Sequence, residues 1–145
     1  MGSMYTPAMP NRTMPGSIVI PVLTYENVEE AISWLCRVFG CTERWRAGSH
    51  RAQLAFGEGA IAVAERPSLP ATTPVFQSHS IMVRVADVNA HYERSLQQGA
   101  EIQQPPIDFP YGERQYNVID PGGHIWVFSQ SLTDIAPEDW GGKTA

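Results

Sequence analysis

The sequence repeats one plan of secondary structure twice, and this repeat limits the possible folds more than any other feature. Asn27-Val28 and Asp87-Val88 lie 60 positions apart, and each pair follows a β-branched stretch and begins a stretch with helical periodicity. In each copy the order indicated is strand, helix, strand, strand, strand. We therefore expect an internal duplication of a βαβββ unit, with one copy at residues 17–66 and the other at residues 76–131.

The two expected helices have clear start and stop signals. Asn27 is a favourable N-cap, and Glu30 three residues later completes a capping box. Asp87 begins the second helix in the same way. Apolar residues then recur at helical spacing as far as Gly40 in the first copy and Gly99 in the second, and glycine commonly follows the last helical turn. These signals predict one amphipathic helix in each copy.

The expected strands lie between turn signals. Pro21 indicates an edge or a bulge in the first of them. Side chains alternate between the two faces of a strand. This alternation predicts that Leu54, Trp126 and Phe128 face the core and that Gln53 and Ser129 lie on the opposite face. The predicted strands are residues 17–23, 42–46, 50–56 and 60–65 in the first copy, and 80–85, 101–104, 115–119 and 124–130 in the second.

Composition supports a folded domain and excludes several classes of function. Of the 145 residues 43% are hydrophobic, enough for a core, and 12 Gly with 12 Pro suit many turns and short strands. The net charge of −5 argues against a protein that binds nucleic acid or an anionic membrane, because both tasks need concentrated positive charge. The only lysine is Lys143, which excludes a Schiff-base or P-loop lysine from the body of the chain.

Cysteine content and the N-terminal residues indicate a cytoplasmic protein. Cys36 and Cys41 are expected to be reduced structural thiols, because two cysteines make no disulfide framework. No apolar run approaches the roughly 20 residues that a membrane-spanning helix needs, and the first residues do not resemble a signal peptide. The predicted organisation is a disordered leader at residues 1–16, a single domain at 17–131 with a proline-rich linker at 67–74, and a C-terminal tail at 132–145.

Three stretches of the sequence carry a family resemblance. They are Pro-Val-Leu at 21–23 leading into Asn-Val-Glu-Glu-Ala-Ile at 27–32, Tyr-Gly-Glu-Arg at 111–114, and Asp-Pro-Gly-Gly-His-Ile-Trp at 120–126. These stretches resemble the vicinal oxygen chelate superfamily, which includes glyoxalase I, extradiol dioxygenases and bleomycin-resistance proteins, and within it the PhnB-like subgroup. The resemblance implies an α+β fold in which two βαβββ modules form a curved mixed sheet around a cleft. It also implies a homodimer, which is common in the family.

The resemblance further implies where a metal would be held. The family's metalloenzymes place a His, Gln or Glu near the start of the first strand of each repeat, and a Glu in the last strand. The matching positions here are Ile20, Ser80, Ala62 and Val127. Three of these side chains are aliphatic and cannot ligate a divalent ion, and a one-residue shift to His79 would still lack partners. We therefore expect no metal and no other cofactor, and neither glyoxalase I nor extradiol dioxygenase chemistry.

The candidate ligand-binding residues are aromatic, basic and amide side chains on or beside strands of the implied cleft. Together with neighbouring arginines such as Arg44 and Arg46, they suit a planar, partly anionic organic molecule through stacking and cation–π contacts. The alternative is that the arginines only neutralise surface acids. The candidates are Trp45, Arg51, Gln53, His79, Phe109, Tyr111, Arg114 and Tyr116.

These residues favour one function and leave two alternatives open. We expect a metal-free protein that binds and sequesters a small aromatic or drug-like molecule, as an antibiotic-resistance protein does. The first alternative is an enzyme of the same superfamily, a lyase, isomerase or dioxygenase with unusual or absent metal ligands, although no catalytic residue can be assigned from spacing. The second is an interaction module without a small ligand. The expected partners are the small molecule and a second copy of the chain, with no nucleic acid and no membrane.

Overall fold

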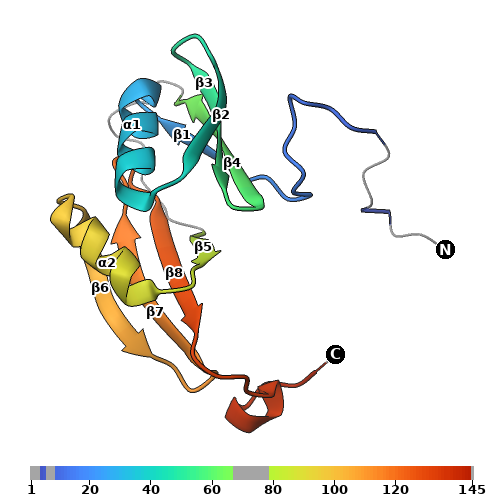
Figure 1. Ribbon diagram of the computed structural model, residues 1–145, viewed down its shortest axis with the longest axis vertical. Helices are drawn as coiled ribbons and strands as arrows, with labels where there is room; N and C mark the ends of the chain where they lie inside the picture. The colour runs from blue at the N-terminus through green and yellow to red at the C-terminus, as the bar shows by residue number, and fades with distance from the viewer. Residues whose placement is uncertain (1–3, 6–8, 67–78, 145) are drawn as a thin grey trace, which may run out of the picture. The chain divides into compact units, whose positions relative to one another are not determined.

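Two similar units make up the chain, residues 1–71 and residues 72–145 (Figure 1). We call them unit 1 and unit 2. Each contains one four-stranded mixed sheet with one α-helix against it, so the α+β class and the duplicated βαβββ order are confirmed. The structure is a computed structural model that describes residues 4–5, 9–66 and 79–144. The linker predicted at 67–74 lies outside these residues.

Unit 1 consists of β1 (Val22–Tyr25), α1 (Val28–Phe39), β2 (Thr42–Ala47), β3 (Arg51–Phe56) and β4 (Gly59–Glu65). Its strand order is β1-β4-β3-β2, with β1 parallel to β4 and the other pairs antiparallel. The strand predicted at residues 17–23 begins later than expected, because Pro21 has no N–H to donate. The carbonyl of Pro21 accepts a hydrogen bond from the Ala62 N–H at 2.9 Å, and the strand pairing starts directly after it.

Unit 2 repeats this order with β5 (Ile81–Arg84), α2 (Val88–Gln97), β6 (Glu101–Asp108), β7 (Glu113–Ile119) and β8 (Ile125–Ser131), followed by the 3₁₀ helix η1 (Pro137–Trp140). Its strand order is β5-β8-β7-β6, again with the first strand parallel to the last. β6 continues beyond the predicted residues 101–104 through two prolines. A sheet tolerates them there because β6 is an edge strand whose register with β7 shifts between Gln104 and Ile107.

The helices lie where their caps predict. The Asn27 Oδ1 accepts from the Glu30 N–H at 3.0 Å, and the Asp87 Oδ1 accepts from the Ala90 N–H at the same distance. Gly40 closes α1 at a φ of 77°, a left-handed conformation that glycine adopts without steric cost. With 12 residues in α1 and 10 in α2, the described part of the chain has no helix long and apolar enough to cross a membrane.

The core of unit 1 lies between α1 and its sheet. Leu35 and Val38 of α1 and Leu54 and Val63 of the sheet are completely buried. Full burial of each such side chain contributes about 1.5–3 kcal/mol. At the end of α1, Cys36 and Cys41 are free thiols, as expected, and burial raises the pKa of the Cys41 thiol above its usual range.

In unit 2 three aromatic rings pack under α2. Trp126 and Phe128 are fully buried, which confirms their predicted core parity, and Phe128 stacks on His91 of α2 with ring centroids 3.9 Å apart. Tyr116 is buried beside them, and its hydroxyl lies 2.8 Å from the Ser95 Oγ and 2.5 Å from the His91 Nδ1. Burial raises the pKa of Tyr116 to about 12.

The Tyr116→Phe variant is therefore expected to lose less stability at alkaline pH than the wild-type protein. The folded state raises the pKa of this phenol from 10.0 to about 12. The protonated phenol therefore stabilises the folded state fully below about pH 10, and this stabilisation is lost as the pH rises through 12. Between about pH 8 and about pH 11 the free energy of unfolding of the wild type should fall by about 1.4 kcal/mol more than that of the variant. Urea unfolding at both pH values measures the difference. Tyr5→Phe, at an exposed tyrosine, serves as the control. An equal alkaline loss in Tyr116→Phe and wild type would contradict the expectation.

Candidate ligand-binding site

Each sheet has one face against its helix and one opposite face, which we call the helix-free face. Side chains alternate between the two faces along a strand, and residues paired across strands share a face. In unit 2 the register places Arg84, Ser129 and Gln115 side by side on the helix-free face, with Glu113 opposite Ser131 in the same row. In unit 1 it places Trp45 beside Gln53. Polar side chains therefore gather on the face of each sheet that does not form the core.

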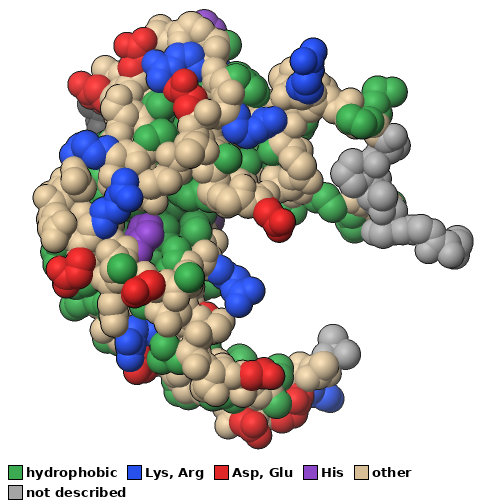
Figure 2. Space-filling model, viewed as in Figure 1, with side chains coloured by type: hydrophobic (Ala, Val, Ile, Leu, Met, Phe, Trp, Pro, Cys, Tyr) green, Lys and Arg blue, Asp and Glu red, His purple; other side chains and the backbone are tan. Residues whose placement is uncertain are grey.

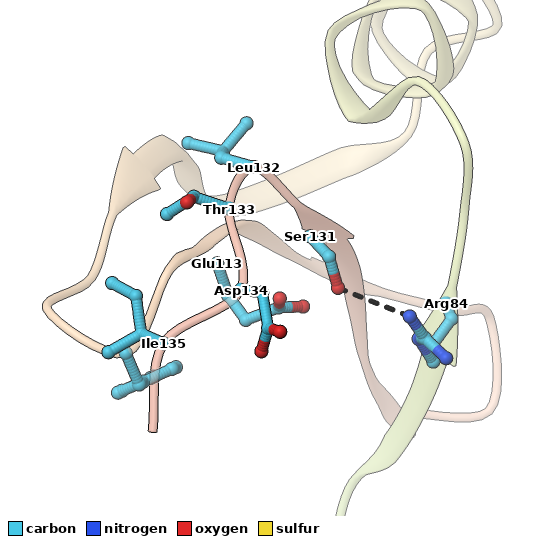
Figure 3. Close-up of a pocket in the computed structure, with 8 residues that line it drawn as sticks. Arg84, Glu113, Ser131, Leu132, Thr133, Asp134 and Ile135 are labelled. Carbon is cyan, nitrogen blue, oxygen red and sulfur yellow. Dashed lines mark hydrogen bonds between the residues drawn. The ribbon is translucent and has the colours of Figure 1, made fainter. Parts of the chain in front are cut away.

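A pocket of about 470 Å³ lies where this row of unit 2 meets the chain after β8 (Figure 3). Its volume is in the range of small-molecule sites, about 300–1,000 Å³. Figure 3 shows the carboxyl groups of Glu113 and Asp134 close together and Arg84 across from them. The lining residues are Arg84, Tyr111, Glu113, Ser131, Leu132, Thr133, Asp134 and Ile135.

Hydrogen bonds hold the polar floor of this pocket in place. The Gln115 Nε2 donates to the Ser129 Oγ at 3.1 Å, and the Ser129 hydroxyl donates to the Glu113 Oε1 at 2.7 Å. Arg84 donates from Nη2 to the Ser131 Oγ at 3.2 Å. Hydrogen bonds from Ser131 and Ser129, and the positive charge of Arg84, lower the pKa of Glu113 below its usual range. Glu113 is therefore an ionised carboxylate at neutral pH.

An aromatic cluster surrounds Tyr111, which lines the pocket. The rings of Phe109 and Tyr111 are stacked, with centroids 5.3 Å apart and an interplanar angle of 12°. Trp140 of η1 lies 5.3 Å from Tyr111 on a tilted plane, and 45% of its surface is exposed. The tail predicted at residues 132–145 thus supplies both a wall and an exposed indole. Exposed rings of this kind offer a stacking surface to a flat ligand.

Gly112, between the aromatic cluster and Glu113, ties the wall of the pocket to β7. Its carbonyl accepts a hydrogen bond from the Leu132 N–H at 2.8 Å, and its φ is +85°. A Cβ at this position would lie 2.6 Å from the Thr133 carbonyl oxygen. The glycine of the Tyr-Gly-Glu-Arg motif is therefore required by the close approach of the chain after β8.

Asp120 organises the turn between β7 and β8. Its Oδ1 accepts from the Gly122 N–H at 2.9 Å and from the His124 N–H at 3.0 Å, and its Oδ2 accepts from the Trp126 Nε1 at 2.9 Å. The Asp-Pro-Gly-Gly-His-Ile-Trp motif thus has a structural role, which fixes the start of β8 and the buried indole. It brings no chemistry to the pocket.

In unit 1 the helix-free face is in contact with part of the predicted leader. The Trp45 Nε1 and the Gln53 Nε2 both donate to the carbonyl of Thr13, at 3.0 and 3.1 Å. Arg44 donates to the carbonyls of Arg12 and Met14 at 3.3 and 3.4 Å. Residues 1–3 and 6–8 of the leader lie outside the described part of the chain, whereas residues 12–14 are held by side chains of β2 and β3.

The structure brings together some of the candidate residues within each unit. Tyr111 lines the pocket and Phe109 stacks on it, while Trp45 and Gln53 share a hydrogen-bond acceptor. Arg51 and His79 are exposed and do not line this pocket.

Tyr116, one of the ligand-binding candidates, is completely buried and lies on the face opposite the pocket, so the structure corrects its place among them. β7 alternates so that Tyr116 points to α2, where its hydroxyl contacts Ser95. Arg114 has the same parity and binds the Asp108 carboxylate of β6 at 2.6 and 3.1 Å. Arg46 likewise pairs with Glu43. For these two arginines the alternative of neutralised surface acids is the one observed.

Six polar residues of the site are absent from the candidates, namely Arg84, Glu113, Ser129, Ser131, Thr133 and Asp134. Alternation along the sequence places Ser129 on the face opposite the core, where the structure also has it. Arg84 could have been found from the alternation of the stretch at 80–85, because its partner across the parallel pair is Ser129. Glu113 and Ser131 carry no comparable signal, since their meeting depends on the pairing of β7 with β8.

The residues at the family's metal positions do not fit a metal centre. Ala62 and Val127 lie in the central strands β4 and β8 with 4% and 9% of their surfaces exposed, and their side chains have no donor atom, nor has that of Ile20. Ser80 alone is a poor ligand. Among residues 4–5, 9–66 and 79–144, no group of three His, Cys, Asp or Glu side chains is placed to hold an ion.

Charged side chains of both signs are interspersed over the face drawn in Figure 2. Nucleic-acid binding needs basic side chains gathered into one patch. This face has no such patch among the described residues.

Comparison with known proteins identifies the family. The model of the Glyoxalase/Bleomycin resistance protein/Dioxygenase superfamily matches residues 17–128. TioX from Micromonospora sp. ML1 is 34% identical over 81% of this chain and 98% of its own, with a TM-score of 0.64.

Two more distant structures share the fold. A glyoxalase/bleomycin resistance protein/dioxygenase from Nocardioides has 20% identity over 88% of this chain and 89% of its own, with a TM-score of 0.65. A lactoylglutathione lyase from Agrobacterium tumefaciens has 14% identity over 81% of this chain and 96% of its own, with a TM-score of 0.64. No curated protein matches the chain. The resemblance predicted from the sequence is confirmed, and the chain belongs to the Glyoxalase/Bleomycin resistance protein/Dioxygenase superfamily.

Proposed function

We propose that the chain binds a small aromatic or drug-like molecule in the unit 2 pocket and sequesters it unchanged, without a metal. The observation that carries this proposal is the combination, in one pocket, of the Tyr111 ring with the Glu113 carboxylate fixed by Ser129 and Ser131. A flat apolar surface beside a few fixed polar groups is typical of small-molecule sites.

The charges of the pocket favour a ligand with a cationic group. Arg84, Glu113 and Asp134 line it, so two carboxylates face one guanidinium. Arg46 and Arg114, which the sequence offered for an anionic ligand, are bound to Glu43 and Asp108 instead. A planar aromatic cation would stack on Tyr111 and place its charge near Glu113.

The state of Glu113 supports binding over catalysis. A general base works best when its pKa lies near the working pH. The pKa of Glu113 is lowered by the hydrogen bonds from Ser131 and Ser129, so its carboxylate is a weak base. With no fitting metal ligands at the family positions, the groups on this pocket are suited to holding a ligand.

Planar aromatic cations such as proflavine are expected to raise the melting temperature of the full-length protein. A ligand at about 100 times its Kd stabilises the native state by about 2.7 kcal/mol, or roughly 10 °C for a chain of this size. Calorimetric titration of Glu113→Gln should give a Kd at least about tenfold higher, because a charged hydrogen-bond partner is lost. Glu101→Gln, at an exposed carboxylate of β6 outside the pocket, should bind like the wild type.

Three results would count against sequestration in this pocket. No stabilisation by any aromatic cation or anion would favour the interaction module. Equal affinity in Glu113→Gln would place the ligand elsewhere. Conversion of the bound molecule, followed by mass spectrometry, would show catalysis.

An enzyme of the same superfamily is the second candidate, and the presence of two carboxylates, Glu113 and Asp134, in one pocket favours it. Metal analysis of protein purified without chelator separates the two functions. A stoichiometric divalent ion whose removal by EDTA abolishes turnover would support the enzyme. Metal-free protein that binds the probe and leaves it unchanged would support sequestration.

We also propose, from family membership, that the working form is a homodimer, and, from the two cysteines and the N-terminal residues, that it is cytoplasmic. Light scattering after size exclusion measures the mass of the assembly, and a monomer at micromolar concentration would contradict the dimer.

A further inference from the structure

Three side chains of unit 1 donate hydrogen bonds to three consecutive main-chain carbonyls. Arg44 binds the carbonyls of Arg12 and Met14, and Trp45 and Gln53 both bind that of Thr13. None of these bonds involves the side chains of residues 12–14. The donors therefore recognise a row of amide carbonyls in a bent peptide.

The donors are linked to one another. Gln53 is a polar side chain with only 4% of its surface exposed, and its Oε1 accepts a hydrogen bond from the Arg44 guanidinium. The register of β2 against β3 shifts between Glu43 and Trp45. A shift of this kind redirects side chains, and here it lets the adjacent residues Arg44 and Trp45 reach the same acceptor row. Within this arrangement Gln53 is the buried member, and Arg44 is the exposed one.

The occupant is shaped by its own hydrogen bonds. The Asn11 Oδ1 accepts from the Thr13 N–H at 3.0 Å, and the Asn11 carbonyl accepts from the Met14 N–H at 2.9 Å. Asparagine is favoured at the first position of such a turn. The turn exposes the carbonyls of residues 12–14 to β2 and β3.

We propose that Arg44, Trp45 and Gln53 form a second binding site, for the amide carbonyls of a peptide-like ligand, and that the chain fills this site with its own residues 12–14. An external ligand of this class then binds only when the turn at residues 11–14 leaves. The site lies wholly within unit 1 and does not depend on the function proposed for the unit 2 pocket.

Tethering sets the size of the expected effect. A short flexible tether gives an effective concentration in the millimolar range. If the free peptide binds with a Kd of about 0.1 mM, the tethered turn occupies the site about nine-tenths of the time, and the apparent affinity of a competitor falls about tenfold.

The probe is a fluorescein-labelled synthetic peptide with the sequence of residues 9–16, added to full-length protein and followed by anisotropy. Thr13→Pro loosens the turn, because it removes the N–H that Asn11 binds and proline is disfavoured at the third position of such a turn. We expect the peptide to bind Thr13→Pro about tenfold more tightly than wild type. Met9→Ala, at an exposed leader residue outside the turn, should behave like wild type.

The location is tested by removing one donor at a time. In the Thr13→Pro background, Trp45→Phe should weaken peptide binding about tenfold, because the ring stays and only its N–H is lost. Gln53→Ala should weaken it likewise, and circular dichroism verifies that both variants fold. In labelled Thr13→Pro protein the indole N–H signal of Trp45 should move on titration with the peptide.

Equal binding of the peptide to wild type and Thr13→Pro, or no binding to either, would overturn the proposal. So would binding that survives both Trp45→Phe and Gln53→Ala. Glu113→Gln should leave peptide binding unchanged, so failure of the unit 2 proposal and failure of this one give different results.

Discussion

The Gly112→Ala variant is expected to melt roughly 10 °C below the wild-type protein and to lose most of its binding in the unit 2 pocket. A left-handed backbone costs a non-glycine residue about 1–2 kcal/mol. At Gly112, with a φ of +85°, the added Cβ would also stand 2.6 Å from the Thr133 carbonyl oxygen, so the segment after β8 must move. Together these effects should lower the free energy of unfolding by about 3–4 kcal/mol. Thermal melting and calorimetric titration measure the two losses.

Gly99→Ala is the matched control for the conformational cost. Gly99 has a φ of +78° but no atom near the position of an added Cβ. Its replacement should cost only about 1–2 kcal/mol and leave ligand binding intact. If Gly112→Ala were no more damaging than Gly99→Ala, the close approach of Thr133 to Gly112 would have no energetic importance.

The Asp120→Ala variant should lower the free energy of unfolding by about 3–5 kcal/mol. The substitution removes the acceptor of the buried Trp126 Nε1 and of the Gly122 and His124 N–H groups at once. A buried donor without an acceptor loses about 1–3 kcal/mol through desolvation. Urea unfolding measures the loss, and the near-ultraviolet dichroism of the indole should weaken if Trp126 is no longer held.

Asp87→Ala provides the comparison, because Asp87 caps α2 through one side-chain hydrogen bond to the Ala90 N–H. Loss of an N-cap costs about 1 kcal/mol. Asp120→Asn should fall between the two alanine variants, since one oxygen acceptor remains while the amide N–H₂ faces donors. A loss in Asp120→Ala no larger than in Asp87→Ala would mean that the three bonds of Asp120 do not stabilise unit 2 beyond an ordinary cap.

The fold was predictable because its signals are local. Asn27, Asp87 and Gly40 mark helix ends through interactions with residues a few positions away, and each acts as expected. The parity of Trp126 and Phe128 follows from alternation along one strand. Two strands differ clearly from their predicted bounds: the first begins later, because the β-branched stretch is not paired before Pro21, and β6 continues to Asp108.

The site was less predictable because it depends on contacts between distant elements. Tyr116 is predicted to bind a ligand because it lies on a strand of the implied cleft, but alternation along β7 directs its side chain toward α2, where it is completely buried. Glu113 becomes part of a pocket only where the chain around Thr133 returns to Gly112. The contact of Trp45 with residues 12–14 uses a main-chain carbonyl. Every residue has one, so no pattern of residue types predicts this contact.

The parallel pairing of the first strand with the last in each unit has a consequence for synthesis on the ribosome. β1 pairs with β4, and β5 with β8, so neither sheet takes a strand from the other half of the sequence. All strand partners of unit 1 are present once Glu65 has left the exit tunnel, before β5 has emerged from it. Unit 1 can therefore complete its sheet during translation, as N-terminal domains generally do, and its turn at residues 11–14 already has its three donors before the pocket of unit 2 exists.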